Sequence, residues 1–150
     1  MLGRTRQRGF ALTGTMGTPE RNRLDVRLAA TPGSLAVIRR AVVAFAARQD
    51  MPDPPAIGLA VTEAVTNVVL HAYPPGSVGE VRVVACAEPD QLVVVVRDWG
   101  TGMRPRPDSP GLGIGLPTIA SLANAFDVEA ADGVGTLLRM RFTCPAARAA

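Results

Sequence analysis

The residues best suited to chemistry in this 150-residue chain lie in an apolar stretch near its middle, where Glu63 and Asn67 are four positions apart. If residues 56–73 form a helix, this spacing places the two polar side chains one turn apart on the same face. Valines occupy the other faces of this helix, as expected for a helix that is buried on most sides. Burying a carboxylate or an amide is costly without a partner. The pair therefore caps a neighbouring loop, bonds internally, or belongs to a functional site.

A second candidate is Asp98, which follows an apolar run and opens the segment DWGTG. A carboxylate at the end of a strand can accept a hydrogen bond from the exocyclic amino group of adenine. Gly100 and Gly102 would let the backbone come close to such a base. An aspartate that starts a tight turn would give the same short pattern.

Two further groups of candidate residues, both containing glycine, lie downstream. Gly111, Gly113 and Gly115 lead into a predicted helix, so their N–H groups and the positive helix end could hold phosphates, although any flexible loop can carry such a triplet. Thr136 follows Gly135 before the last predicted strand and could place a hydroxyl near a base, or simply end a hairpin turn. The four groups of candidate residues occur together in this order, which indicates a nucleotide site.

Composition excludes several classes of nucleotide-using and nucleic-acid-binding protein. All 16 basic residues are arginine, and a Walker-type phosphate loop and a eukaryotic-type kinase both need a lysine at the phosphates. The net charge is +3, but the first 23 residues carry +4 and the remainder −1. The basic character therefore belongs to the N-terminal segment and not to a nucleic-acid-binding face.

Targeting and metal signals are weak. We find no apolar run close to the ~20 residues that cross a bilayer and no secretory signal, so we expect a cytoplasmic protein that does not enter a membrane. Cys86, Cys144 and His71 are too few for a disulfide framework or a zinc centre.

The elements that would position the candidate residues alternate between strands and helices. Residues 1–22 read as a disordered, arginine-rich leader, residues 23–143 as one domain, and residues 144–150 as a tail. Strands are predicted at 23–29, 80–87, 91–97, 126–130 and 135–143, with the apolar strand 91–97 at the centre of the sheet, and helices at 35–48, 56–73 and 111–124. Ser34 is the expected N-cap of the first helix.

Four segments carry a resemblance to a known superfamily. TEAVTNVVLHAY, DWGTGM, GLGIGL and GVGTLLRMRF resemble the N box and the three glycine boxes of the Bergerat-fold ATPases. Within that superfamily the chain is most similar to the bacterial anti-sigma-factor serine/threonine kinases, over about residues 23–143. The resemblance implies an α/β two-layer sandwich, in which a mixed, mainly antiparallel sheet carries helices on one face.

The same resemblance implies a role for each candidate. Asn67 would ligate Mg²⁺, Asp98 would bond the adenine of ATP, and Thr136 would lie near the base. Glu63 would be the general base, a feature that favours the serine kinase branch over the histidine kinases. The glycines would shape the adenine pocket or form the lid over the phosphates: Gly100 and Gly102 for the pocket, Gly111, Gly113 and Gly115 for the lid.

The implied function is that of an ATP–Mg²⁺-dependent serine/threonine kinase acting on a small anti-anti-sigma-type protein. Such a protein would also bind and restrain a sigma factor, would use Arg39 on its first helix toward protein partners, and would form a homodimer. Two alternatives stay open: a non-catalytic ATP-binding module that switches between partners, and the detached ATP-binding domain of a histidine kinase. Arg39 and Arg40 could equally be part of a solvated helix face.

Overall fold

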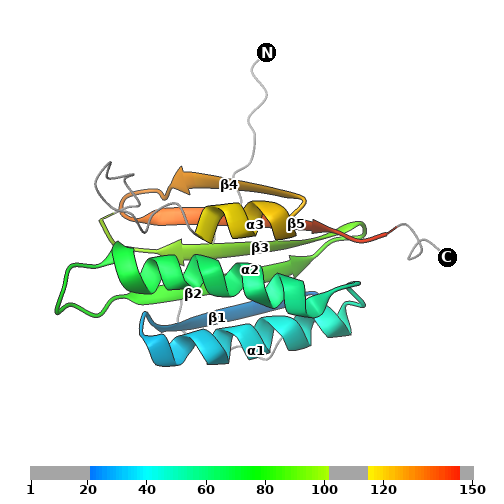
Figure 1. Ribbon diagram of the computed structural model, residues 1–150, viewed down its shortest axis with the longest axis horizontal. Helices are drawn as coiled ribbons and strands as arrows, with labels where there is room; N and C mark the ends of the chain where they lie inside the picture. Colours follow the sequence, from blue (N-terminus) through cyan, green and yellow to red (C-terminus); the bar gives the residue numbers. More distant parts are fainter. Residues whose placement is uncertain (1–20, 102–114, 146–150) are drawn as a thin grey trace, which may run out of the picture.

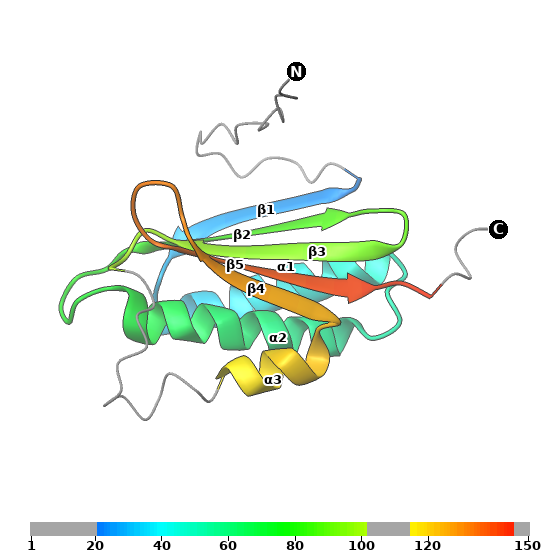
Figure 2. The same cartoon turned by 90° about the horizontal axis from the view of Figure 1, so that it is seen from above.

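A computed structural model of the chain describes residues 21–101 and 115–145. Five strands make one sheet, and three α-helices lie together on one of its faces (Figures 1 and 2). The strands are β1 (Arg23–Ala29), β2 (Glu80–Ala87), β3 (Gln91–Asp98), β4 (Ala125–Ala130) and β5 (Thr136–Thr143). The helices are α1 (Pro32–Arg48), α2 (Pro54–Asn67) and α3 (Gly115–Leu122), and a π-helix, η1 (Val68–Ala72), continues α2.

The sheet has the strand order β1-β2-β3-β5-β4, and β3 lies at its centre as predicted. The α/β two-layer sandwich expected from the sequence is confirmed. All four strand pairings are antiparallel, so within the described residues the sheet is antiparallel throughout and not mixed. After β3 the chain passes through α3 to the edge strand β4, and β5 then returns between β4 and β3, antiparallel to both.

Alternation along the central strands separates two faces of the sheet. In β3, Leu92, Val94 and Val96 are at most 2% exposed and face the helices. Val93 and Val95, between them, are only half-buried and face the other way. The continuous apolar run therefore contributes to a closed core on one face and, on the other, to a surface that none of the described helices covers (Figure 2).

The first helix begins earlier than the sequence suggested. Its N-cap is Thr31 and Pro32 occupies the first turn, whereas Ser34 was the predicted N-cap. Proline at this position has no N–H to leave unsatisfied and its φ already suits a helix, which explains the earlier start. The Ser34 side chain is buried and its hydroxyl donates a hydrogen bond to the carbonyl oxygen of Ala29.

The central helix changes its winding at Asn67. The sequence predicted one helix over residues 56–73, but the α-helix ends at Asn67 and the next five residues form the π-helix η1. Thr62 and Thr66 each donate a hydroxyl hydrogen bond to the carbonyl four residues earlier, a contact that tends to bend helices. Short π-helical segments are frequent at functional sites.

The segment Pro54–Ala72 has 19 residues and a mean hydropathy of 1.2, so by length and composition it could cross a membrane. Contrary to the expectation from the sequence, the chain therefore contains an apolar segment close to the ~20 residues that cross a bilayer. Length and composition are weak evidence alone, because the core helix of a sandwich has the same properties. Half of this segment is buried inside the fold, and α2 packs against α1, α3 and β3.

The two ends of the described chain are tied to the domain. Residues 1–20 and 146–150, most of the predicted leader and tail, lie outside the described residues. The carbonyl of Arg21 accepts a hydrogen bond from the Gln49 side chain, and that of Asn22 accepts one from the Ala87 N–H. The two residues before the predicted boundary at Arg23 therefore contact the rest of the described chain.

Candidate functional site

Asp98 ends β3 on the face that carries the helices, and only 2% of its surface is exposed. Its Oδ1 accepts a hydrogen bond from the Gly100 N–H at 2.9 Å, and the Thr136 backbone supplies another. Burial raises the pKa of this carboxyl above its usual value, and the two backbone hydrogen bonds and the charge of Arg97 oppose that shift. The tight turn expected as the alternative is therefore present, but a carboxylate has about four acceptor positions, which leaves about two for a ligand.

Two glycines bring three separate segments into backbone contact around Asp98. A Cβ atom on Gly100 would lie 1.9 Å from the carbonyl oxygen of Ala72, the last residue of η1. Gly135 has a φ of +102°, and a Cβ there would lie 1.9 Å from the carbonyl oxygen of Asp98. Thr136, next along, is 6% exposed. The structure therefore brings together Asp98, Gly100 and Thr136, three of the residues selected from the sequence.

Asn67 and Glu63 occupy the last two turns of α2. Asn67 is 7% exposed and is the final α-helical residue, and Glu63 is half-buried one turn earlier. Within residues 21–101 and 115–145, neither side chain has a hydrogen-bond partner, so they do not bond each other or cap a described loop. Asn67 lies five positions before Ala72, which contacts the Asp98 loop.

The Asn67 amide oxygen suits a magnesium ion that is held mainly by phosphates. Mg²⁺ prefers oxygen ligands and commonly keeps several waters, with one or two protein ligands plus substrate phosphates. In the described part of the chain, no group of three or more His, Cys, Asp or Glu residues could hold a metal alone. One amide ligand beside a nucleotide is the arrangement that these residues fit.

Tyr73 is a positioning residue to which the sequence analysis gave no role. Its hydroxyl accepts hydrogen bonds from the N–H groups of Glu80 at 3.1 Å and Trp99 at 3.0 Å, and donates one to the Glu80 carbonyl. A Cβ on Gly79 would lie 2.0 Å from its ring. Tyr73 therefore joins the end of η1 to the start of β2 and to the loop after Asp98. The available signal was its place at the end of the TEAVTNVVLHAY segment as the single tyrosine of the chain.

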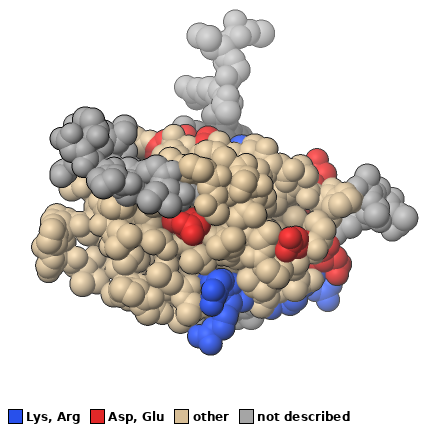
Figure 3. Space-filling view, in the orientation of Figure 1, with Lys and Arg blue, Asp and Glu red and all other residues tan. Residues whose placement is uncertain are grey.

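The remaining candidates are less well defined by the structure. Gly115 begins α3, so a glycine does lead into a helix there, while Gly102, Gly111 and Gly113 lie outside the described residues. Arg39 is exposed on α1, and α1 crosses α2 closely at Gly58, where a Cβ would lie 3.3 Å from the Cγ of Arg39. The helix-bearing face is mostly uncharged, with basic side chains gathered over α1 (Figure 3); Arg39, Arg40 and Arg48 are the exposed arginines of that helix.

Comparison with known proteins shows the family to which the chain belongs. Residues 28–142 match the family described as the histidine kinase-like ATPase domain, and the chain belongs to that family. Within it, the chain is similar to proteins named anti-sigma F factor. It is 30% identical over 128 residues to the one from Clostridium beijerinckii (77% of this chain, 90% of the relative). It is 31% identical over 135 residues to the one from Pasteuria penetrans (81% and 90%) and 29% identical over 133 residues to the one from Clostridium acetobutylicum (80% and 92%).

These matches confirm the family inferred from the four sequence segments. Membership of an ATPase-domain family implies that the chain binds ATP. The buried carboxylate of Asp98 and the polar end of α2 lie on either side of one backbone contact, between Ala72 and Gly100.

Proposed function

We propose that the protein is an ATP–Mg²⁺-dependent serine/threonine kinase and anti-sigma factor that phosphorylates a small anti-anti-sigma-type protein. The observation that carries the kinase assignment is the placement of Glu63, one turn before Asn67 and half-exposed, with no hydrogen-bond partner among the described residues. A carboxylate without a structural contact beside a phosphate site is available to act as a base.

In the proposed reaction, Glu63 accepts the proton of an acceptor serine or threonine hydroxyl as its oxygen attacks the γ-phosphorus of ATP. The bond between the γ-phosphorus and the β–γ bridging oxygen breaks, so that ADP leaves and the phosphoryl group stays on the acceptor oxygen. Asp98 orients the nucleotide by accepting a hydrogen bond from the adenine amino group. Asn67 would hold the Mg²⁺, which when bound neutralises charge on the phosphate oxygens.

The partner assignments rest on the relatives, which are named as anti-sigma F factors. We propose that this chain likewise binds a sigma factor, with the exposed Arg39 on α1 contributing to a protein-binding face, and that it works as a cytoplasmic homodimer. The helix-bearing face is mostly uncharged (Figure 3), and the proposed activity involves no direct nucleic-acid binding.

A non-catalytic ATP-binding module is the alternative that needs an experiment. In that case ATP would set the shape of a partner surface without phosphoryl transfer, and Glu63 would be dispensable. The other alternative, a detached histidine kinase domain, is disfavoured by the carboxylate at position 63, which offers a base that a serine acceptor requires.

The test is a phosphorylation time course with a candidate acceptor, a small anti-anti-sigma-type protein from the same organism. Glu63→Gln keeps the size of the side chain but cannot accept the proton, so we expect a rate loss of about 10²–10⁴-fold. ATP affinity, measured by calorimetry on the same preparation, should stay within about twofold, because Glu63 adds no phosphate-binding charge.

The matched control is Glu129→Gln, the same chemical change at an exposed position on the edge strand β4. It should leave the rate unchanged. A wild-type rate in Glu63→Gln would remove this residue from catalysis. Absence of transfer by the wild type, with ATP-dependent partner binding intact, would favour the binding module.

A further inference from the structure

Trp99 has no role in the proposed reaction, although it lies between the two residues that form the turn at the nucleotide site. Asp98 precedes it, and Gly100, whose N–H donates to Oδ1 of Asp98 at 2.9 Å, follows it. The N–H of Trp99 itself donates a hydrogen bond to the Tyr73 hydroxyl at 3.0 Å. The indole ring is half-buried, so it has contacts of its own that the backbone does not account for.

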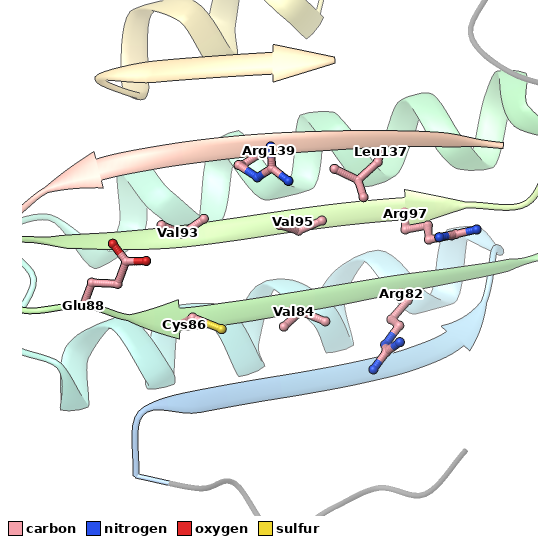
Figure 4. Close-up of a pocket in the computed structure, with 9 residues that line it drawn as sticks. All are labelled: Arg82, Val84, Cys86, Glu88, Val93, Val95, Arg97, Leu137 and Arg139. Atoms are coloured by element: carbon pink, nitrogen blue, oxygen red, sulfur yellow. The ribbon is translucent and has the colours of Figure 1, made fainter. Parts of the chain in front are cut away.

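Two arginines hold the indole ring. The guanidinium carbons of Arg27 and Arg97 lie over the ring, 4.6 and 4.9 Å from its centroid. The strand register puts Arg27, Arg82 and Arg97 in one row across β1, β2 and β3. Figure 4 shows the last two of this row, with Arg97 extended toward the end of β3. Neighbouring strands lie about 4.7–4.9 Å apart, so Arg27 and Arg97 start roughly 9–10 Å apart, which leaves room for a ring between their guanidinium groups.

Other contacts tie this stack to the sheet. The Nε of Arg27 donates a hydrogen bond to the Glu80 carboxylate at 2.8 Å, and the backbone of Glu80 bonds the Tyr73 hydroxyl. Arg97 forms no ion pair within the described residues, so its guanidinium is not drawn away from the ring by a described carboxylate. Trp99 is therefore held by its backbone at Tyr73 and by its ring at two cations.

The turn that presents Asp98 is thus constrained from both faces of the sheet. On the helix side, Gly100 lies against the carbonyl of Ala72. On the other side, the ring of Trp99 is stacked with side chains that point away from the core. The direction of the free acceptor positions of Asp98 depends on where this short backbone lies, because its Oδ1 is bonded to the Gly100 N–H within the same turn.

We propose that Trp99 is a positioning residue for adenine recognition. By stacking with Arg27 and Arg97, it sets the direction in which the Asp98 carboxylate meets the exocyclic amino group of the base. The proposal rests on the contact between Asp98 and adenine in the proposed function, and it adds the residues that position this contact. The ring and its two arginines lie on the face opposite Asp98, so they act through Asp98 and not by touching the base.

Two nucleotides separate positioning from general stability. Purine riboside triphosphate differs from ATP only by lacking the exocyclic amino group, so its Kd divided by the Kd of ATP measures the contact with that group. Calorimetry on the full chain with Mg²⁺ should show that Trp99→Ala lowers this ratio at least about fivefold, since each cation–π contact at such a site contributes a factor of about 2–5. The Kd of purine riboside triphosphate should stay within about twofold. Trp99→Phe, which keeps an aromatic face between the arginines, should recover most of the ratio.

The arginines of the row supply variants that keep the ring. Arg27→Gln and Arg97→Gln should each lower the ratio about two- to fivefold, because each removes one of the two cations. Arg82→Gln is the matched control: Arg82 lies between them in the same row, but its guanidinium bonds Asp25. Its ratio should equal that of the wild type even if the melting temperature falls.

A folded Trp99→Ala protein with the wild-type ratio would overturn the proposal. Equal losses of affinity for both nucleotides would overturn it too, because they would show a role in stability alone. If Trp99→Ala does not fold, the two stacked arginines decide the question by the same ratio. Asp98→Asn separates this result from the proposed function. An unchanged ratio there contradicts the adenine contact itself, whereas a lowered ratio there with unchanged ratios in the Trp99 and arginine variants refutes only the role of Trp99.

Discussion

Asp98→Asn should weaken ATP binding strongly without unfolding the protein. The carboxylate of Asp98 receives two backbone hydrogen bonds, from Gly100 and Thr136, and retains about two acceptor positions for adenine. An asparagine has one oxygen with two lone pairs, which those backbone groups can occupy, and its NH₂ would then meet the adenine amino group as donor against donor. Losing a hydrogen bond to a charged group costs about 1.5–3 kcal/mol, or about 10- to 160-fold in Kd.

Without ATP, the Asp98→Asn variant should not lose unfolding free energy because of the missing carboxylate charge. Because burial raises the pKa of Asp98, the stabilising contribution of its neutral form is present below the unfolded value near 3.8 and is lost as pH rises through the higher folded value. Above that folded value the native protein carries a desolvated charge at Asp98, and the amide removes it. Calorimetric titration with ATP and Mg²⁺, beside thermal melting, measures both effects.

Asp53→Asn is the matched control for this change. Asp53 caps the opposite end of α2 with a hydrogen bond from the Ala56 N–H, and asparagine is an equally good N-cap. Its Kd for ATP should equal that of the wild type. An Asp98→Asn protein that binds ATP within twofold of the wild type would refute the adenine assignment.

Three further changes test other parts of the account. Asn67→Ala should remove the Mg²⁺-dependent part of ATP affinity while the melting temperature stays within a few degrees, so equal titrations with and without Mg²⁺ are expected for the variant alone. Gly100→Ala should cost about 1–3 kcal/mol of unfolding free energy in urea titrations, because its methyl would overlap the Ala72 carbonyl, whereas Gly33→Ala, with nothing closer than 3.9 Å, should cost far less. The hydrogen bond from Arg82 lowers the pKa of Asp25, so its stabilisation is present above pH 3.8 and is lost as pH falls through the lower folded value; Asp25→Asn should be less stable at neutral pH and flatter in the acid range.

The positions of the elements were largely predictable because their signals are local. Alternating and continuous apolar runs gave β1, β2 and β3 to within a residue, and the central place of β3 followed from its apolar residues on both faces. The start of α1 was missed because Thr31 and Ser34 are both good caps, and only the buried contact from Ser34 to Ala29 distinguishes them. Such a contact depends on tertiary packing.

The candidate residues of the site could be selected from the sequence, but their arrangement in space could not. Asp98, Gly100 and Thr136 were selected from separate segments, and only the fold brings their backbones together. The π-helical end of α2 was invisible in the sequence, since Val68–Ala72 fits an α-helix equally well by periodicity. Tyr73 contacts the backbone of Trp99, 26 residues further along the chain, so a linear pattern does not reveal its role.

The most direct test of the central claim is a single-turnover reaction that starts from ATP labelled in its γ-phosphate. The protein is loaded with labelled ATP and Mg²⁺, mixed with the candidate acceptor, and quenched over time, and labelled acceptor is quantified against ADP. We expect one labelled serine or threonine for each ADP formed, with both products appearing at the same rate. ADP that accumulates with free labelled phosphate and no labelled acceptor, or an absence of ADP despite bound ATP and acceptor, would contradict the kinase assignment.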